Sequence, residues 1–159
     1  MYQYIKKEDN DPLFTFITKH GLNYYIAFKK MEFENNYFQN LYSIDFWEVD
    51  NKKFIKDNAI EATIIEIIFD FFKVFPNVLL HYVCDSMDNK QNFRSKLFDN
   101  WYNKSINEGF SKLDINYEIP NETIKYKLDF IFKSEFYDLN EVGEKTNLQL
   151  EEFSSYKPN

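Results

Sequence analysis

The residues whose types could do chemistry lie closest together between positions 84 and 94. Cys84 is the only cysteine of the chain, and Asp85 and Asp88 follow it within four positions. Arg94 is the only arginine, since 18 of the 19 basic residues are lysines. A guanidinium group offers a flat fork of donors that fits a carboxylate or a phosphate, whereas an ammonium group acts as a point charge. This segment is therefore the first candidate for a site.

A ligand-binding interpretation assigns this segment a role. Asp85 and Asp88 would hold a divalent cation of unknown identity through their carboxylate oxygens. Arg94 would bind a phosphate or carboxylate of the ligand, and Gln91 belongs to the same candidate set. The segment joins a predicted strand to a helix N-terminus, where backbone N–H groups and the helix dipole favour anions. The arrangement would suit a metal-assisted phosphoryl reaction.

A purely structural role explains the same four residues. Asp88 followed three positions later by Gln91 is a capping-box pattern, and Asp85 could pair with Arg94 across the first helical turns. Two aspartates are few for a metal site, and the segment lacks the spacing of an EF-hand and the glycines of a phosphate-binding loop. Both interpretations stay open, and we expect an ion pair between Arg94 and one of the two aspartates.

The sequence assigns no catalytic residue and no cofactor. His81 and Cys84 would face opposite sides of one strand, because side chains alternate along a strand, so they cannot easily form a dyad. Cys84 is expected to be a small buried apolar residue, and His81 a core or interface residue. The sequence contains no Gly-x-Ser-x-Gly elbow, zinc-ligand set or His-Glu-x-x-His motif.

The composition indicates one domain over residues 1–159, with residues 1–12 and about 145–159 loosely ordered. A chain of 159 residues with 44% hydrophobic residues can bury a core. The net charge of −7 argues against nonspecific nucleic-acid binding, which depends on neutralising phosphates. A single cysteine and the lack of an apolar leader predict a reducing, cytoplasmic location. No stretch reaches the roughly 18 apolar residues of a membrane span, so we expect no membrane contact.

Periodicity predicts the elements that would position these residues. Alternation predicts a hairpin over 13–18 and 22–29 with a turn at His20-Gly21, and a third strand over 41–49. Helical spacing predicts a long helix capped by Asp57 or Asn58 and ended by Pro76-Asn77. A central strand over 78–84 and a second helix over 89–103 follow. The chain then forms a hairpin over 113–119 and 124–132, and a short helix near 135–142 is possible.

These elements predict an α+β fold in the order ββ(β)αβαββ. The sheet would be mixed or antiparallel, with about five to six strands, and two helices would pack on one of its faces. The last two strands alternate apolar residues with lysines, aspartates and asparagines. We therefore expect the polar side of that hairpin to face water.

One run of residues resembles a family signature. The run is Val83-Cys84-Asp85-Ser86-x-Asp88-x-x-Gln91-x-x-Arg94-x-x-Leu97-Phe98-x-x-Trp101. It is similar to a family of small uncharacterised proteins, found mostly in Bacteroidota, whose domain has no known function. The preceding helix and the first hairpin are similar too, so the resemblance covers roughly residues 13–102. It implies that the segment matters to the family, and it implies no activity.

Composition and motifs together favour a small acidic protein without catalytic activity. The predicted function is a protein-interaction module of the antitoxin, immunity or defence-accessory type, which would bind a protein partner or form a homodimer. Its acidic surface and many tyrosines would supply the contacts. The alternative is a phosphate-binding or metal-dependent phosphoesterase-like protein that uses Asp85, Asp88 and Arg94.

Overall fold

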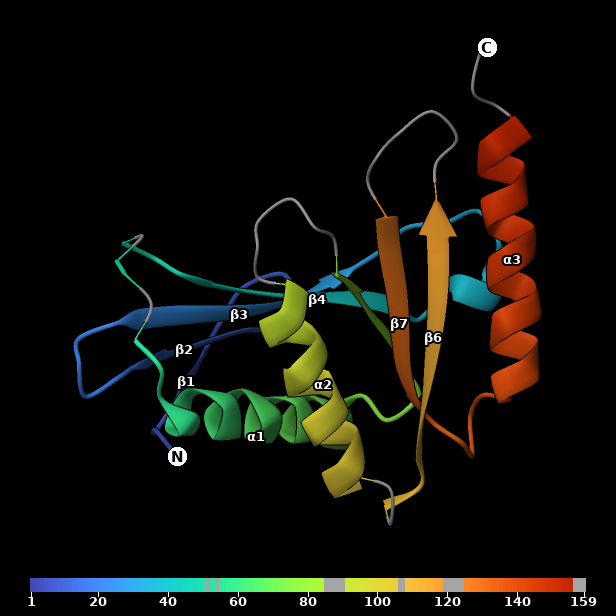
Figure 1. Cartoon of the computed structure of the whole chain (residues 1–159). Coiled ribbons are helices and arrows are strands. Elements are labelled where there is room, and N and C mark those ends of the chain that lie inside the picture. The colour runs from blue at the N-terminus through green and yellow to red at the C-terminus, as the bar shows by residue number, and fades with distance from the viewer. Residues whose placement is uncertain (51, 54, 85–90, 106–107, 119–124, 156–159) are drawn as a thin grey trace.

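The computed structural model describes residues 1–50, 52–53, 55–84, 91–105, 108–118 and 125–155 (Figure 1). Within these ranges, the side chains of residues 83–84, 91–94, 117–118, 125–126 and 153–155 are not described. The fold is α+β, with a seven-stranded mixed sheet and three α-helices.

The first half of the sheet is a run of antiparallel strands. It comprises β1 (Ile5–Lys7), β2 (Leu13–Ile17), β3 (Asn23–Lys30) and β4 (Leu41–Glu48). The predicted hairpin is confirmed: Gly21 adopts φ +76° in its turn, a conformation that glycine reaches without steric cost. The Thr18 hydroxyl accepts hydrogen bonds from the backbone N–H groups of His20 and Leu22, which fixes the turn. A short 3₁₀ helix, η1 (Asn36–Phe38), lies between β3 and β4.

Helix α1 (Asn58–Val74) begins where the sequence predicted it. Asp57 is the N-cap, and its side chain accepts a hydrogen bond of 2.9 Å from the backbone N–H of Ala59. The phenol of Tyr2 also donates to Asp57, and the backbone N–H of Tyr2 donates to the hydroxyl of Thr63 at 2.8 Å. These two bonds hold Tyr2 against the first turns of α1.

The second half of the sheet starts with a parallel pair. Strand β5 (Leu79–Cys84) runs parallel to β4, and the register between them comprises three residue pairs, 41–43 with 79–81. Helix α2 (Gln91–Ser105) leads to the antiparallel hairpin of β6 (Phe110–Glu118) and β7 (Lys125–Lys133). Strand β7 inserts between β5 and β6, so the strand order is β1-β2-β3-β4-β5-β7-β6. Figure 1 shows α3 (Leu139–Ser155) standing beside β6 and β7.

The two faces of the sheet carry different helices. Leu80 and Tyr82 pack with residues of α1 and α2 in the larger hydrophobic core, where the Tyr82 ring stacks on Phe98. Leu79 packs in a second core with Val142 of α3. Because neighbouring residues of a strand point to opposite faces, α1 and α2 cover one face of β5 and α3 covers the other. This face is called the α3 face below.

The sequence underestimated the number of elements. It predicted about five to six strands and two helices on one face, whereas seven strands and three helices are described, with α3 on the opposite face. The short strand β1 lies within a polar segment that shows no strand-like alternation. Helix α3 extends to Ser155, well beyond the short helix expected near 135–142.

Candidate functional site

The residues that the sequence favoured cannot be placed in a site. Asp85 and Asp88 belong to the segment 85–90 between β5 and α2, which lies outside the described residues. Gln91 and Arg94 lie in the first turn of α2, but their side chains are not among those described. The expected ion pair of Arg94 therefore stays a prediction. In the part of the chain that is described, no group of three or more His, Cys, Asp or Glu side chains could hold a metal ion.

A pocket of about 180 Å³ lies on the α3 face of the sheet. Its floor comes from strands β4, β5 and β7, one wall from the connection between β3 and β4, and the other wall from α3. The lining residues are Met31, Phe33, Phe38, Leu41, His81, Leu128, Phe130, Thr146, Gln149 and Leu150. The walls are almost entirely apolar, so the pocket favours an apolar ligand or an apolar part of a larger one.

The strand register explains why these side chains meet. His81 pairs with Ser43 on one side and with Phe130 on the other, so it lies at the junction of β4, β5 and β7. Phe130 and Leu128 are two residues apart on β7, and both therefore point to the α3 face. This junction lies at the last residue pair between the parallel strands, Ser43 with His81. Local sequence cannot specify its position, because the pairing joins residues that are far apart in the chain.

His81 is the one ionisable side chain among the residues that line this pocket. Its ring lies 6.0 Å from the ring of Phe130. Burial lowers the pKa of His81 to about 4, because an imidazolium ion loses its hydration in such surroundings. At neutral pH the side chain is therefore an uncharged imidazole, which can accept one hydrogen bond and donate another.

Two polar side chains of α3 complete the pocket. Thr146 is 5% exposed, and its hydroxyl oxygen is buried without a hydrogen-bond partner among the described residues. Leaving a buried hydroxyl unpaired costs about 1–3 kcal/mol, so a ligand group that pairs with it would be favoured. Gln149 lies about one helical turn further along the same lining surface. The pocket thus combines apolar walls with a few groups able to orient a ligand.

The sequence predicts that His81 is a core or interface residue, and it does not indicate a pocket around this side chain. A histidine within the apolar run 78–84 was the available signal. The pocket itself could not be predicted, because it needs α3 to cover the face opposite α1 and α2, and α3 was predicted as a short helix.

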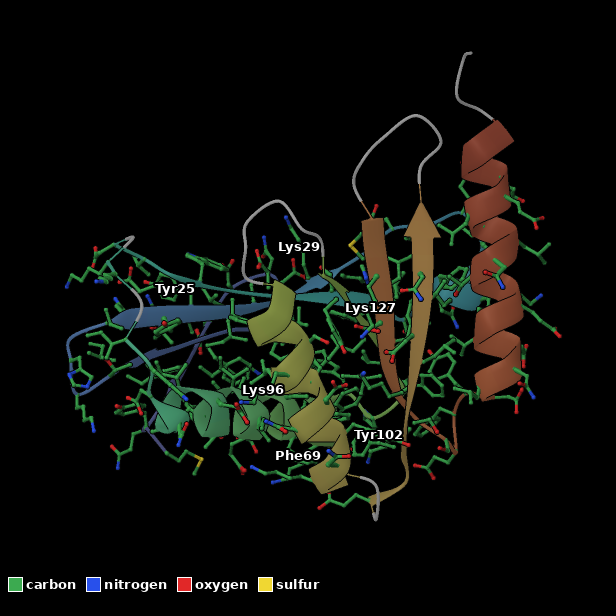
Figure 2. All side chains as sticks on the ribbon, in the orientation of Figure 1. Tyr25, Lys29, Phe69, Lys96, Tyr102 and Lys127 are labelled. Carbon is green, nitrogen blue, oxygen red and sulfur yellow. The ribbon has the colours of Figure 1, made fainter. Side chains whose placement is uncertain are left out.

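A second group of titratable residues lies on the opposite face of the sheet. This Asp–Lys cluster consists of Asp99, Lys112, Asp114, Lys127 and Asp129. The Lys112 ammonium lies 2.7 Å from the Asp99 carboxylate and 3.0 Å from that of Asp114. The Lys127 ammonium lies 3.8 Å from Asp129 and 3.9 Å from Asp114 (Lys127 is labelled in Figure 2). Asp114 and Asp129 occupy paired positions of β6 and β7.

Asp129 is the most unusual member of this cluster. It is 0% exposed, and burial together with the neighbouring Asp114 carboxylate raises the pKa of Asp129 to about 7. The sequence predicted that the polar side of this hairpin faces water, and for Asp129 that prediction is wrong. A fully buried carboxyl cannot reach a substrate, so this group is an internal proton-binding site and the α3 pocket is the better candidate for function.

The sequence matches a family of proteins over residues 56–135, just over half of the chain. The family is described as Family of unknown function (DUF6169). The chain belongs to this family. The membership agrees with the predicted resemblance to a family without a known function, while the Bacteroidota origin and the signature run remain predictions. None of the curated proteins matches the sequence.

Two solved structures resemble the fold at low identity. One is of a protein provisionally named phosphinothricin N-acetyltransferase, with 12% identity and a TM-score of 0.44, over 80% of this chain and 74% of that one. The other is an acetyltransferase of the GNAT family from Streptococcus pneumoniae, with 9% identity and a TM-score of 0.43, over 79% of this chain and 69% of that one. At these values the likeness carries no activity, substrate or site to this chain.

The comparison nevertheless corrects the function predicted from the sequence. That prediction was a non-catalytic interaction module, with a phosphate-binding or phosphoesterase-like protein as its alternative. Both neighbours carry the name of an acetyltransferase, which belongs to neither of those classes, so the comparison contradicts the predicted function without assigning another one to this chain. None of the helices in the described part of the chain has the length and apolar character that crossing a membrane requires.

Proposed function

We propose that the α3 pocket is the active site of an enzyme that transfers an acyl group from a thioester to an amine or hydroxyl acceptor. The apolar part of the substrate would occupy the pocket, and His81 would accept the proton of the acceptor. The observation that carries this proposal is an uncharged, largely buried imidazole in an apolar pocket, at the junction of the two parallel strands.

The other lining residues narrow the reaction class. The ten lining side chains include no cysteine, serine, lysine or carboxylate. The hydroxyl of Thr146 has no hydrogen-bonded base among the described residues that would activate it as a nucleophile. A site with one proton acceptor and no activated nucleophile suits a direct transfer between two bound substrates, without a covalent enzyme intermediate.

The proposed step is a direct attack on the thioester. The acceptor nitrogen or oxygen forms a bond to the carbonyl carbon, the C–S bond breaks, and the sulfur leaves as a thiolate. The acceptor proton passes to the His81 imidazole and from there to the thiolate. An imidazole in an apolar pocket takes a proton from an ammonium ion poorly. The acyl-accepting substrate would therefore enter the reaction as a neutral amine or as a hydroxyl.

The pocket volume limits the acyl group. A cavity of about 150 Å³ holds one benzene-sized ring, so a pocket of about 180 Å³ suits a short acyl chain or a single ring. The acyl group would be apolar, because the pocket offers few partners for additional polar atoms.

Thiol release tests the proposal directly. The protein would be incubated with coenzyme A thioesters of two to eight acyl carbons and with amine and alcohol acceptors, and the freed thiol would be measured. We expect release with the shorter chains, and a loss of about 10²–10⁴-fold in kcat/KM for His81→Ala. The matched control is His20→Ala, which changes the other histidine of the chain, an exposed turn residue.

Two outcomes would overturn the proposal. If no thioester releases thiol and none raises the melting temperature of the protein, the pocket is not an acyl-transfer site. If His81→Ala transfers the acyl group as fast as wild type and His20→Ala, the proton is accepted elsewhere.

A further inference from the structure

A second concave surface lies next to the α3 pocket, and it has the opposite character. It is formed by η1, by the turn before β5, and by the segment that joins β7 to α3. Its volume is about 430 Å³, within the roughly 300–1,000 Å³ of small-molecule sites. We refer to it as the η1–α3 groove.

Carboxamide side chains supply much of the polar surface of this groove. They belong to Asn36, Gln39, Asn40 and Asn77. Within the described ranges, the side chains of Asn36, Gln39 and Asn77 form no hydrogen bond to another residue, which leaves their donors and acceptors to solvent or a ligand. Each carboxamide offers two donors and one acceptor, so the surface can bind several neutral polar groups at once.

Aromatic rings form the rest of the surface and are held in place by their neighbours. Tyr37 lies edge-on to Tyr137 with 6.1 Å between ring centroids, and Tyr137 lies edge-on to Phe132 at 5.8 Å. The Tyr137 hydroxyl donates a hydrogen bond of 2.8 Å to the backbone carbonyl of Asn77. Phe136 also lines the groove and is 46% exposed. A ligand would therefore meet an exposed ring beside rings of fixed orientation.

The charges of the lining favour a neutral ligand over an anionic one. Glu141 is the one charged residue that lines the groove, and no lysine or arginine lines it. The ammonium group of Lys145 lies outside the lining, 5.8 Å from the centre of the Tyr37 ring. A phosphate or carboxylate would therefore meet a carboxylate without a compensating cation in the lining.

We propose that the η1–α3 groove binds a neutral polyhydroxylated molecule, namely a mono- or disaccharide. A sugar presents hydroxyl groups that pair with carboxamides and a carboxylate, and it presents C–H faces that lie against aromatic rings. The proposal does not depend on the acyl-transfer proposal, because the two sites share no lining residue.

Ligand-observed and protein-observed NMR would test it. The probes would be glucose, galactose, mannose, N-acetylglucosamine and their common disaccharides, each added up to about 10 mM so that a Kd of about 1 mM is detected. We expect one or more sugars to shift backbone amide signals within 36–40 and 136–141. Saturation transfer would then identify which C–H face of the sugar touches the protein.

Two variants make the test specific. Phe136→Ala removes the exposed ring and Asn77→Ala removes one carboxamide while leaving the carbonyl that Tyr137 uses, so both should fold. Each should weaken binding at least fivefold, whereas Leu148→Ala, at an exposed position of α3 outside the groove, should bind as wild type. The proposal is overturned if no sugar shifts the groove signals, or if both groove variants bind like Leu148→Ala.

Discussion

At the scale of single residues, His81 and Asp129 are two titratable groups of the described part of the chain whose pKa values burial displaces. His81 is held uncharged on the α3 face, and Asp129 binds a proton on the face covered by α2. Each has a folded-state pKa far from its usual value, so each links the stability of the fold to pH. The two links have opposite signs, and substitution can separate them.

His81 should make the fold sensitive to acid. Its folded pKa of about 4 lies below the unfolded value of 6.5, so the unfolded chain binds the proton more readily. As the pH drops from 6.5 towards 4, protonation of His81 in the unfolded chain should lower the free energy of unfolding by up to about 3 kcal/mol. Above pH 6.5 this histidine should leave the free energy of unfolding unchanged. Urea unfolding of His81→Phe across this range should lose that dependence, while His20→Ala should keep it. An unchanged slope in His81→Phe would show that the imidazole is not buried.

Asp129 should act in the opposite direction. Its folded pKa is raised to about 7, so the folded chain holds a proton that the unfolded chain has released. Its contribution to stability is complete below pH 3.8 and is lost as the pH rises to 7. The stability of Asp129→Asn relative to wild type, measured by urea unfolding, should therefore be higher at pH 8 than at pH 5. Asp45→Asn, at an exposed position of β4, is the control. Equal pH dependence in both variants would contradict the raised pKa.

At the scale of elements, α1 connects the sheet to the N-terminal residues. Its apolar face supplies Ile60, Ile64, Ile67 and Phe71 to the larger core, where Phe71 stacks on Phe28 of β3 with 3.9 Å between ring centroids. Its first turn is closed by Asp57, which also accepts a hydrogen bond from Tyr2. One side chain thus joins a helix start to the first residues of the chain.

Removing this cap should have a measurable cost. Asp57→Ala should lower the free energy of unfolding by about 1–2 kcal/mol, because it removes the N-cap hydrogen bond and the partner of Tyr2. Asp57→Asn keeps a capping oxygen and should lose less than half of that amount. Chemical denaturation of both variants at pH 7 provides the measurement, and equal losses would mean that charge matters more than capping.

At the scale of the whole molecule, the sheet separates two cores of unequal size. The larger core contains α1 and α2, and the smaller contains Val142 of α3 with Leu79, Phe130 and Phe132. The α3 pocket and the η1–α3 groove are both on the side of the smaller core. The side that carries the candidate sites is thus the side with less apolar packing, where local opening requires less free energy.

Hydrogen exchange should reveal this division. Val142→Ala should destabilise the smaller core by about 2 kcal/mol and lower amide protection mainly in α3. Ile64→Ala, at an equally buried position of α1, should lower protection throughout the chain, because it removes packing from the larger core. A uniform loss of protection in Val142→Ala would show that the two cores unfold as one unit.

The amino-acid sequence by itself determined the local elements of this protein. Strand periodicity placed the first hairpin and the hairpin of β6 and β7, and helical periodicity with Asp57 and Pro76 placed α1, because these signals depend on neighbouring residues alone. The α+β class followed from them. Only the tertiary structure decided that β4 and β5 are parallel, that β7 inserts between β5 and β6, and that α3 covers the second face.

The same limit applies to the candidate sites. The alternation of Lys127 and Asp129 with apolar residues shows that one side of β7 is polar, but burial depends on which helix covers that side. His81 lies in an apolar run that predicts burial on both faces, whereas the pocket around it is built by residues more than 45 positions away in β7 and α3. A periodic pattern records which residues share a face. The element that packs on that face is chosen by contacts between distant parts of the chain.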